Sequence, residues 1–422
     1  MSALSGLTTR GRCLLAAGVA AAVCSWALNE RDLLRVAMFV VALPLLVVVY
    51  LSLSKVRIGA ARQLLPDRVA AGSESQAQLE LWRTGHLPAG EVLLEDGVAY
   101  ALGARPRFLV ERLPHDRRVR LRYPLRPVLR GIQQIGPLRA TITDPFGLCE
   151  FDRELIGHST LIVVPRTAEL TGLPAGSGTG VAEDGTIHRS AGQGDPDAMV
   201  RQYRHGDDLR MVHWRSTARR DEIMVRLEQK PRHGGTTVLL DHRAAAHHGT
   251  GPSASLEWAV SFAASACLHL RRAGQAVRLV TEHGKALAEI PADSGPGMDP
   301  LVLDALAVLQ PAHQRDITMG HDPAAGQELI AVLGSVSTEA VHELCGRRSR
   351  STRSLAVLLD TAAWSDEVTA STQRAVAVET AAGLLRGAGW GTVIVRPNTS
   401  MAGAWSELCR ATGRRPRLAG MP

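Results

Sequence analysis

The stretch Thr236–Asp241 reads TTVLLD, and it decides the fold of the C-terminal half of the chain. A short run of β-branched and apolar residues is typical of a strand buried on both faces of a sheet. The next segment, Leu256–Arg272, has the apolar period of an amphipathic helix, and Gly274 follows its end. A buried strand followed by such a helix indicates an α/β unit.

The same alternation continues toward the C-terminus. We expect further strands at 276–281, 329–333, 355–359 and 392–395, and helices at 339–347, 371–385 and 404–412. Strands that alternate with helices predict a parallel sheet covered on both faces. The sequence therefore predicts an α/β parallel-sheet domain within residues 201–422.

Residues 56–165 have a different pattern, with a period of two. In Arg118–Tyr123 basic and apolar side chains alternate without a break, as a half-buried strand requires. Turn signals, such as Asp96-Gly97, Arg130-Gly131 and Asp144–Gly147, separate several runs of this kind. Short strands at this spacing predict an antiparallel β-sandwich of immunoglobulin-like layout. Residues 166–200, rich in glycine and small polar residues, are predicted to be a flexible linker.

The N-terminal residues 1–55 carry two apolar stretches. Cys13–Asn29 and Val36–Ser54 each approach the roughly 20 residues that a helix needs to cross a bilayer. The short polar loop Glu30–Asp32 lies between them. The pattern predicts a two-helix transmembrane hairpin that binds the lipid bilayer.

Basic residues lie outside this hairpin on both sides. Arg10 and Arg12 precede the first stretch, and Lys55 and Arg57 follow the second. Flanking Lys and Arg mark the cytoplasmic side of a membrane protein. We therefore expect a two-pass protein of the cell membrane with both termini and the soluble domains in the cytoplasm. If the first stretch is instead a cleaved signal peptide, the second still leaves the soluble part inside.

The composition agrees with an ordered protein. Of 422 residues, 45% are hydrophobic and 21% are charged, with a formal net charge of +7. This mild basic excess suits an anionic lipid surface, and it does not by itself indicate nucleic-acid binding. None of the 6 cysteines forms a CxxC pair, which excludes the common zinc patterns.

One segment concentrates reactive side chains: Arg201–Arg220 reads RQYRHGDDLRMVHWRSTARR. Asp207 and Asp208 are suited to begin a short helix, because carboxylates complement its positive end. In such a helix Arg210 lies three residues from Asp207 and four from Trp214, spacings at which an ion pair and a cation–π contact form. Local pairing of this kind uses much of the chemistry in the segment.

Three functions compete for this segment. In a hydrolase of the cell envelope, His213 could act as a base, with Thr217 or Ser216 as nucleophile. In a module that binds nucleic acid or another anionic polymer, the arginines would contact phosphates, although the interleaved aspartates weaken the positive field. The position before the first strand of the α/β domain favours a third function, an interdomain clasp or a partner-docking surface.

The segment resembles the signature of the domain of unknown function 58 family, which is widespread in bacteria. The matching residues are Arg201, Tyr203, Gly206, Asp207, Asp208, Arg210, His213, Trp214, Ala218 and Arg219. Thr217 stands where the family usually has serine. A second block is similar to the family's RG, GP and DPFGL motifs: Arg130-Gly131, Gly136-Pro137 and Asp144–Leu148.

The resemblance implies a membrane-anchored protein whose C-terminal domain is similar to von Willebrand factor A. It also implies a partner, a MoxR-type AAA+ ATPase, with which such proteins would assemble or activate others. No reaction is established for the family. We therefore expect a non-enzymatic scaffold or adaptor, with no cofactor and no specific nucleic-acid partner. The signature residues, Thr217 included, would form the interaction or interdomain site.

Domains of the von Willebrand type bind metal through Asp-x-Ser-x-Ser after their first strand. Here the matching position reads DHRAA from Asp241, so both serines are missing and Arg243 brings a competing charge. We expect no metal site at Asp241. We also expect Asp360 to be a turn former with a solvated carboxylate, and His247 and His248 to be exposed loop residues.

Overall fold

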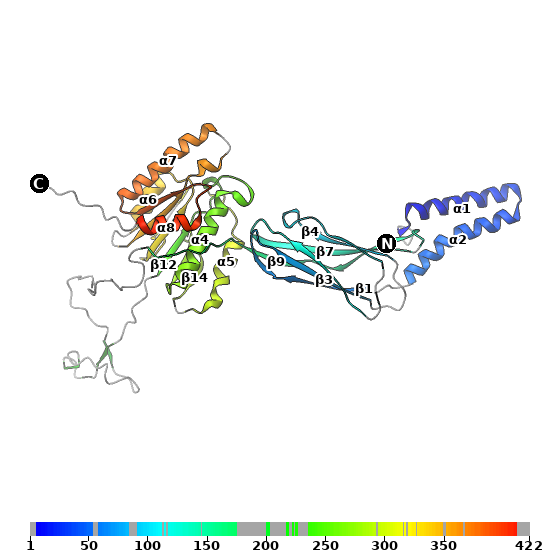
Figure 1. The fold of residues 1–422 in the computed structure, drawn as a ribbon, viewed down its shortest axis with the longest axis horizontal. Helices are drawn as coiled ribbons and strands as arrows, with labels where there is room; N and C mark the ends of the chain where they lie inside the picture. The colour runs from blue at the N-terminus through cyan, green and yellow to red at the C-terminus, as the bar shows by residue number, and fades with distance from the viewer. Residues whose placement is uncertain are drawn as a thin grey trace. The chain divides into compact units, whose positions relative to one another are not determined.

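The computed structural model describes residues 6–53, 58–83, 91–111, 114, 117–144, 146–174, 200–202, 217–218, 222, 224–226, 235–292, 294–314, 316–317, 320–325, 327–348, 352–365 and 368–411. The chain divides into two compact units. The first contains residues 1–167, 250–253 and 303–310, and the second contains the remainder. Figure 1 shows the elements of both units along the chain.

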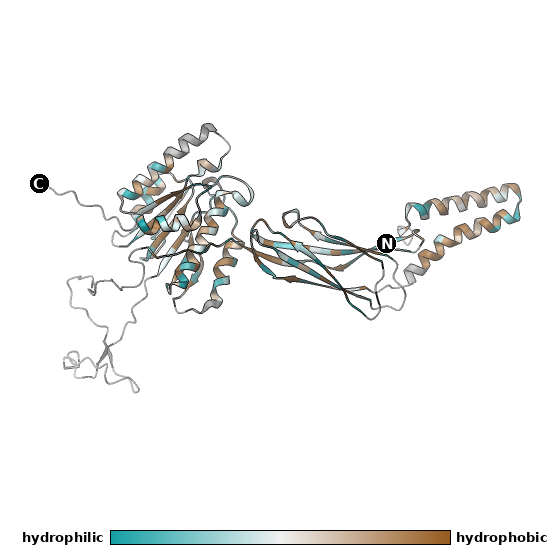
Figure 2. Ribbon diagram, in the orientation of Figure 1, coloured by the Kyte–Doolittle hydropathy of each residue, from teal (hydrophilic) through white to brown (hydrophobic). Residues whose placement is uncertain are grey.

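The first unit begins with a helical hairpin. Helices α1 (Thr9–Leu28) and α2 (Arg31–Leu53) pack against each other, and Asn29 adopts a left-handed conformation at the end of α1. Both helices are mostly apolar, with polar residues near their ends (Figure 2), and are long enough to cross a bilayer. Because a helix that is apolar on all sides avoids water, the hairpin fits a membrane anchor.

A β-sandwich follows the hairpin. One sheet has the order β1-β3-β6, and the other has the order β2-β9-β7-β4-β5, with β8 paired to β7. The strands are β1 (Ile58–Leu65), β2 (Arg68–Ala70), β3 (Ser75–Arg83), β4 (Val92–Val98), β5 (Arg107–Val110), β6 (Val119–Leu125), β7 (Gly131–Thr143), β8 (Glu150–Ile156) and β9 (Ser159–Val164). Their inward side chains form one core, with Leu79, Leu94 and Leu138 fully buried.

The alternating pattern at Arg118–Tyr123 is confirmed, because β6 buries Tyr123 and Leu125 and exposes Arg120 and Arg122. Two details differ from the sequence prediction. Strands β2 and β9 pair in parallel, so the sandwich is not wholly antiparallel. The predicted turn at Asp96-Gly97 is wrong: both residues lie inside β4, where its pairing with β7 shifts register.

The second unit contains a six-stranded sheet of order β14-β13-β12-β15-β16-β17. Its strands are β12 (Thr236–Leu240), β13 (Val277–Thr281), β14 (Ala286–Ile290), β15 (Glu328–Leu333), β16 (Ser354–Leu359) and β17 (Gly391–Val395). All neighbouring pairs are parallel except β13 and β14. The predicted parallel sheet is confirmed for the five predicted strands, and β14 adds an antiparallel edge strand. Only a short turn joins β14 to β13, and a parallel connection needs a long crossover.

Helices cover both faces of this sheet. On one face α4 (Ser255–Arg272) and α8 (Met401–Ala411) contact the strands and each other, with Phe262 and Trp405 fully buried. On the other face α6 (Thr338–Arg347) and α7 (Val368–Gly387) pack over Ala331 and Leu358. A further helix, α5 (Asp299–Ala307), follows β14. Neither β14 nor α5 was predicted from the sequence.

The beginning of the predicted linker at 166–200 packs against the α/β domain. Ser265 of α4 accepts a hydrogen bond from the Ala168 amide at 2.9 Å. The Gly172 carbonyl accepts one from Trp405 Nε1 at 3.0 Å, and His269 Nε2 lies 2.7 Å from the same oxygen. Residues 168–174 are thus held by α4 and α8. Residues 175–199 lie outside the described part of the chain.

Candidate functional site

Acidic side chains follow three strands of the sheet at its carboxyl edge. Asp241 follows β12, Glu282 follows β13 and Asp360 follows β16. All three are buried. Because parallel strands end at one edge, these carboxylates belong to the edge at which open α/β sheets commonly bind ligands.

Asp241 is paired with Arg243 of its own loop. Arg243 Nη2 lies 2.7 Å from Asp241 Oδ2, and Arg243 Nε lies 2.9 Å from Oδ1. The Gly334 amide also donates to Oδ2 at 3.3 Å, and Arg243 donates to the Ser335 carbonyl at 3.0 Å. Both partners are buried. The pair therefore joins the end of β12 to the end of β15 from inside the domain.

These contacts decide whether Asp241 fits a divalent cation. Both of its carboxylate oxygens already accept hydrogen bonds from the guanidinium group, whose positive charge repels a metal ion. Within the described residues, no group of three His, Cys, Asp or Glu side chains has a metal-binding arrangement. The donor set at Asp241 does not fit a metal site of the von Willebrand type.

Glu282 is the second buried carboxylate, and sequence reasoning missed it. His242 Nδ1 lies 2.6 Å from Glu282 Oε2, and the His242 amide donates to the same oxygen at 3.2 Å. Burial raises the pKa of Glu282, but the hydrogen bonds from His242 outweigh this effect and hold the pKa below its ordinary value. A histidine oriented by a carboxylate can also serve as a base. Glu282 directly follows the buried strand β13, and this position is the feature of the sequence by which it could have been found.

Asp360 was predicted to have a solvated carboxylate, and this is wrong. The residue is 5% exposed, and Arg396 Nε donates to its Oδ2 at 3.1 Å. Arg396 follows the edge strand β17, and its side chain is 68% exposed. The pair links the ends of β16 and β17, and it leaves part of the arginine at the surface.

His247 was predicted to be exposed, and this is also wrong. Its Nε2 lies 2.8 Å from the Asp241 carbonyl oxygen, and its Nδ1 lies 3.1 Å from Ser255 Oγ. Burial lowers the pKa of His247, and the nearby Asp241 opposes part of this effect. His248 is also only partly exposed. The loop after β12 is thus ordered by its own polar side chains.

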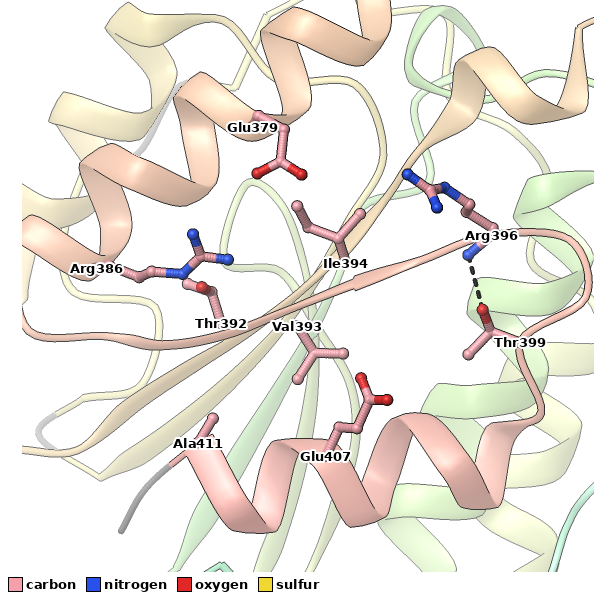
Figure 3. A pocket seen from close by; sticks show the side chains of 9 residues that line it. All are labelled: Glu379, Arg386, Thr392, Val393, Ile394, Arg396, Thr399, Glu407 and Ala411. Carbon is pink, nitrogen blue, oxygen red and sulfur yellow. Dashed lines mark hydrogen bonds between the residues drawn. The ribbon is translucent and has the colours of Figure 1, made fainter. Parts of the chain in front are cut away.

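A polar pocket of about 460 Å³ lies along the edge strand β17. Figure 3 shows Glu379 and Arg386 of α7 on one side of the strand and Glu407 of α8 on the other. Arg396 and Thr399 lie beyond the end of β17, where the Arg396 amide donates to Thr399 Oγ1 at 3.0 Å. Two carboxylates and two guanidinium groups suit a polar ligand of mixed charge.

The predicted interaction segment is described only in part. Arg201 lies in strand β10 (Val200–Gln202), and Thr217 is half-buried in a helical turn. The other predicted site residues lie outside the described residues: Tyr203, Gly206, Asp207, Asp208, Arg210, His213, Trp214 and Arg219. The short helix predicted there therefore stays a prediction.

The structure adds a feature that the sequence did not predict. Strand β10 pairs antiparallel with β11 (Met224–Arg226), with Arg201 opposite Val225. This two-stranded ribbon pairs the start of the signature segment with residues that follow its end. Its strands are too short to have a recognisable period, which is why the pattern missed them.

A comparison with known families gives a match. Residues 199–333 match the model of a family described as "Protein of unknown function DUF58". The matched region runs from β10 to the end of β15, so it includes the signature segment, Asp241 and Glu282. The match supports the resemblance based on the signature. None of the curated proteins matches the chain.

Several solved structures share weak similarity with the chain. A CARDB domain from Pyrococcus furiosus, crystallised in complex with di-metal ions, is 14% identical, covering 26% of this chain and 93% of that one at a TM-score of 0.20. A cohesin module from a Clostridium perfringens family 33 glycoside hydrolase is 15% identical. It covers 26% of this chain and 98% of its own, also at a TM-score of 0.20.

Proposed function

We propose that this protein is a membrane-anchored, non-enzymatic scaffold or adaptor that works with a MoxR-type AAA+ ATPase. Together they would assemble or activate other proteins. In this proposal the C-terminal sheet is a domain of the von Willebrand factor A type that has given up its metal. The DUF58 match over residues 199–333 supports the family resemblance from which the proposal starts.

The main observation behind the proposal is that the acidic side chains at the carboxyl edge of the sheet are already paired within the domain. The described acidic groups there are Asp241, Glu282 and Asp360, and each is engaged by a basic side chain of the same domain. Buried charges need internal partners of this kind, and these pairs join neighbouring strand ends within the domain. This favours a domain that presents a surface to a protein partner.

The apolar hairpin supports the proposed attachment to the membrane. Helices α1 and α2 fit a membrane anchor, with Arg10 and Arg12 in the first turn of α1 and Lys55 and Arg57 after the end of α2. With the soluble domains on the cytoplasmic side, they would be accessible to a soluble AAA+ ATPase, which requires cytoplasmic ATP. The bilayer would then hold the adaptor in place while the partner acts.

The test is recovery of the partner from native membranes. The full-length protein, tagged at its C-terminus, is purified in mild detergent with and without a non-hydrolysable ATP analogue. Co-purifying proteins are then identified by mass spectrometry. We expect an AAA+ ATPase to be enriched over a tagged, unrelated two-pass membrane protein. Repeated recovery without any AAA+ ATPase would contradict the proposal.

A further inference from the structure

The turn between β7 and β8 is attached to the start of helix α1. Thr8, which caps this helix, accepts the Gly11 amide on its hydroxyl oxygen at 3.2 Å. The same residue donates from its amide to the Leu148 carbonyl at 2.9 Å and from its hydroxyl to the Gly147 carbonyl at 2.7 Å. The loop of the sandwich and the first turn of the hairpin thus share one hydrogen-bonded junction.

Packing places this turn level with the ends of the hairpin helices. Leu148 and Cys149 are buried in a small apolar cluster with Leu7, Val47 and Val48. Val48 precedes the end of α2 at Leu53 by about 7.5 Å, given a rise of about 1.5 Å per residue. The turn therefore contacts the apolar part of the helix, inside the stretch that is expected to lie in the bilayer.

The tip of the turn carries an exposed aromatic ring. Phe146 is 64% exposed, although Leu148 beside it is buried. The backbone around it is held by Asp144, whose carboxylate accepts the Phe146 amide at 2.9 Å and the Cys149 amide at 2.6 Å. A buried, hydrogen-bonded aspartate thus holds a turn that presents phenylalanine to its surroundings.

We propose that Phe146 inserts its ring into the boundary between the lipid headgroups and the acyl chains. This inference rests on the proposed membrane anchor, because it requires α1 and α2 to cross the bilayer. The turn is attached to the first residues of α1, where Arg10 and Arg12 would meet the headgroups. An exposed apolar ring at that level gains free energy by leaving water for the bilayer interface. Phe146 would then attach the sandwich to the membrane surface, in addition to the two helices of the hairpin.

The experiment uses photocrosslinking in the full-length protein. It is reconstituted in vesicles of phosphatidylethanolamine and phosphatidylglycerol, with p-benzoylphenylalanine replacing one residue at a time. The variants are Phe146→p-benzoylphenylalanine, Tyr100→p-benzoylphenylalanine and Phe39→p-benzoylphenylalanine. After irradiation, lipid adducts on the labelled peptide are measured by mass spectrometry.

Tyr100 and Phe39 are matched controls. Tyr100 is 99% exposed in the same sandwich but follows Val98, which pairs with Ile135 of β7. Ile135 lies about 26 Å along β7 from the end of the strand at Thr143, given a rise of about 3.3 Å per residue. Phe39 is 68% exposed on α2 and reports whether the hairpin itself is in lipid.

We expect lipid adducts at positions 39 and 146, and at least tenfold fewer at position 100. Adducts at position 39 alone, with position 146 no higher than position 100, would overturn the inference and leave the anchor intact. Crosslinks from position 146 to protein instead of lipid would also overturn it. No adduct at position 39 would refute the membrane anchor, and this inference with it.

Discussion

At the scale of single residues, the sandwich is held by a buried ion pair between its two sheets. Arg62 of β1 donates from Nε to Asp96 Oδ2 of β4 at 3.1 Å, and both side chains are fully buried. Tyr123 of β6 donates its hydroxyl to the same carboxylate at 2.6 Å. Burial, followed by the contact with Asp96, raises the pKa of Tyr123 well above its ordinary value, so this phenol stays a donor. Arg62 also donates to the Ile135 carbonyl at 2.9 Å.

Replacing Arg62 with methionine should destabilise the sandwich strongly. The change leaves Asp96 charged, buried and without its main partner, which costs about 3–5 kcal/mol. In hydrogen-exchange mass spectrometry of the full-length protein in detergent, peptides from β1, β4 and β6 should lose protection. The control is Arg107→Met, because Arg107 is 67% exposed in its pair with Glu95 and should behave like the wild type. Equal protection in the two variants would refute the stabilising role of Arg62 in its pair with Asp96.

His247 should make the α/β domain sensitive to mild acid. Burial lowers the pKa of the folded-state imidazole below its usual 6.5, so the unfolded chain binds a proton more readily. Its contribution to stability is full above about pH 6.5 and is lost as the pH falls through that value toward the folded pKa. The melting temperature of the full-length protein should therefore fall as the pH is lowered from about 8 to about 5.5. His247→Asn should flatten this profile, and His313→Asn, at an exposed position, should leave it unchanged.

At the scale of elements, two strands of the sandwich approach each other closely at glycines. A Cβ on Gly97 of β4 would overlap the carbonyl oxygen of Gly136 in β7. The register of β4 against β7 shifts between Asp96 and Val98. Gly97 lies at this shift, directly against the backbone of Gly136. Asp96-Gly97 has the letters of a tight turn, but here the aspartate binds Arg62 and the glycine permits the approach. Two residues that favour a turn thus lie inside a strand, because both make contacts with residues far away in the sequence.

Gly97→Ala should destabilise the sandwich by about 1–3 kcal/mol, because the added methyl group has no room between β4 and β7. Thermal unfolding of the full-length protein, followed by exchange of β4 and β7 peptides, measures the change. Gly157→Ala is the matched control, since a Cβ there would have its nearest neighbour at 3.8 Å, an ordinary contact. A Gly97→Ala variant as stable as Gly157→Ala would contradict this account.

At the scale of the whole molecule, the hairpin predicts a definite topology. Arg10, Arg12, Lys55 and Arg57 should hold both outer flanks in the cytoplasm. A fluorescent protein that folds only in the cytoplasm should fluoresce at the C-terminus. Alkaline phosphatase, which is active only outside the cytoplasm, should be active when inserted at the loop Glu30–Asp32. The reverse pattern would place the soluble domains outside and contradict the proposed ATPase partner.

The signature segment gives a second prediction at this scale. If it is a clasp, Trp214→Ala should lower the unfolding midpoint of the full-length protein by several degrees, because it removes the predicted contact with Arg210. If it is a docking surface, the midpoint should stay constant and recovery of the ATPase should fall. His213→Ala tests the hydrolase alternative, which requires loss of function with normal stability and normal partner binding.

The strand and helix positions were predictable where a buried run had a clear period. The strands β12, β15, β16 and β17 and the helices α4, α6 and α8 lie within a few residues of their expected places. In contrast, β14 and the ribbon β10–β11 were missed, because short or exposed strands carry little periodic signal. In the polar cluster at the sheet edge, Asp241 and Asp360 were identified from the sequence; Glu282 also follows a predicted strand directly, but its pairing with His242 left no signal in the sequence.

The sequence by itself determined the apolar hairpin, the two classes of soluble fold and the similarity carried by Arg201–Arg219. These follow from local composition, period and spacing, which need no knowledge of distant neighbours. Only the tertiary structure decided that Arg243 pairs with Asp241, that Asp360 is buried against Arg396, and that the turn carrying Phe146 is hydrogen-bonded to the start of α1. Such pairings depend on which strand ends and loops meet in space, and no local pattern of residues records that.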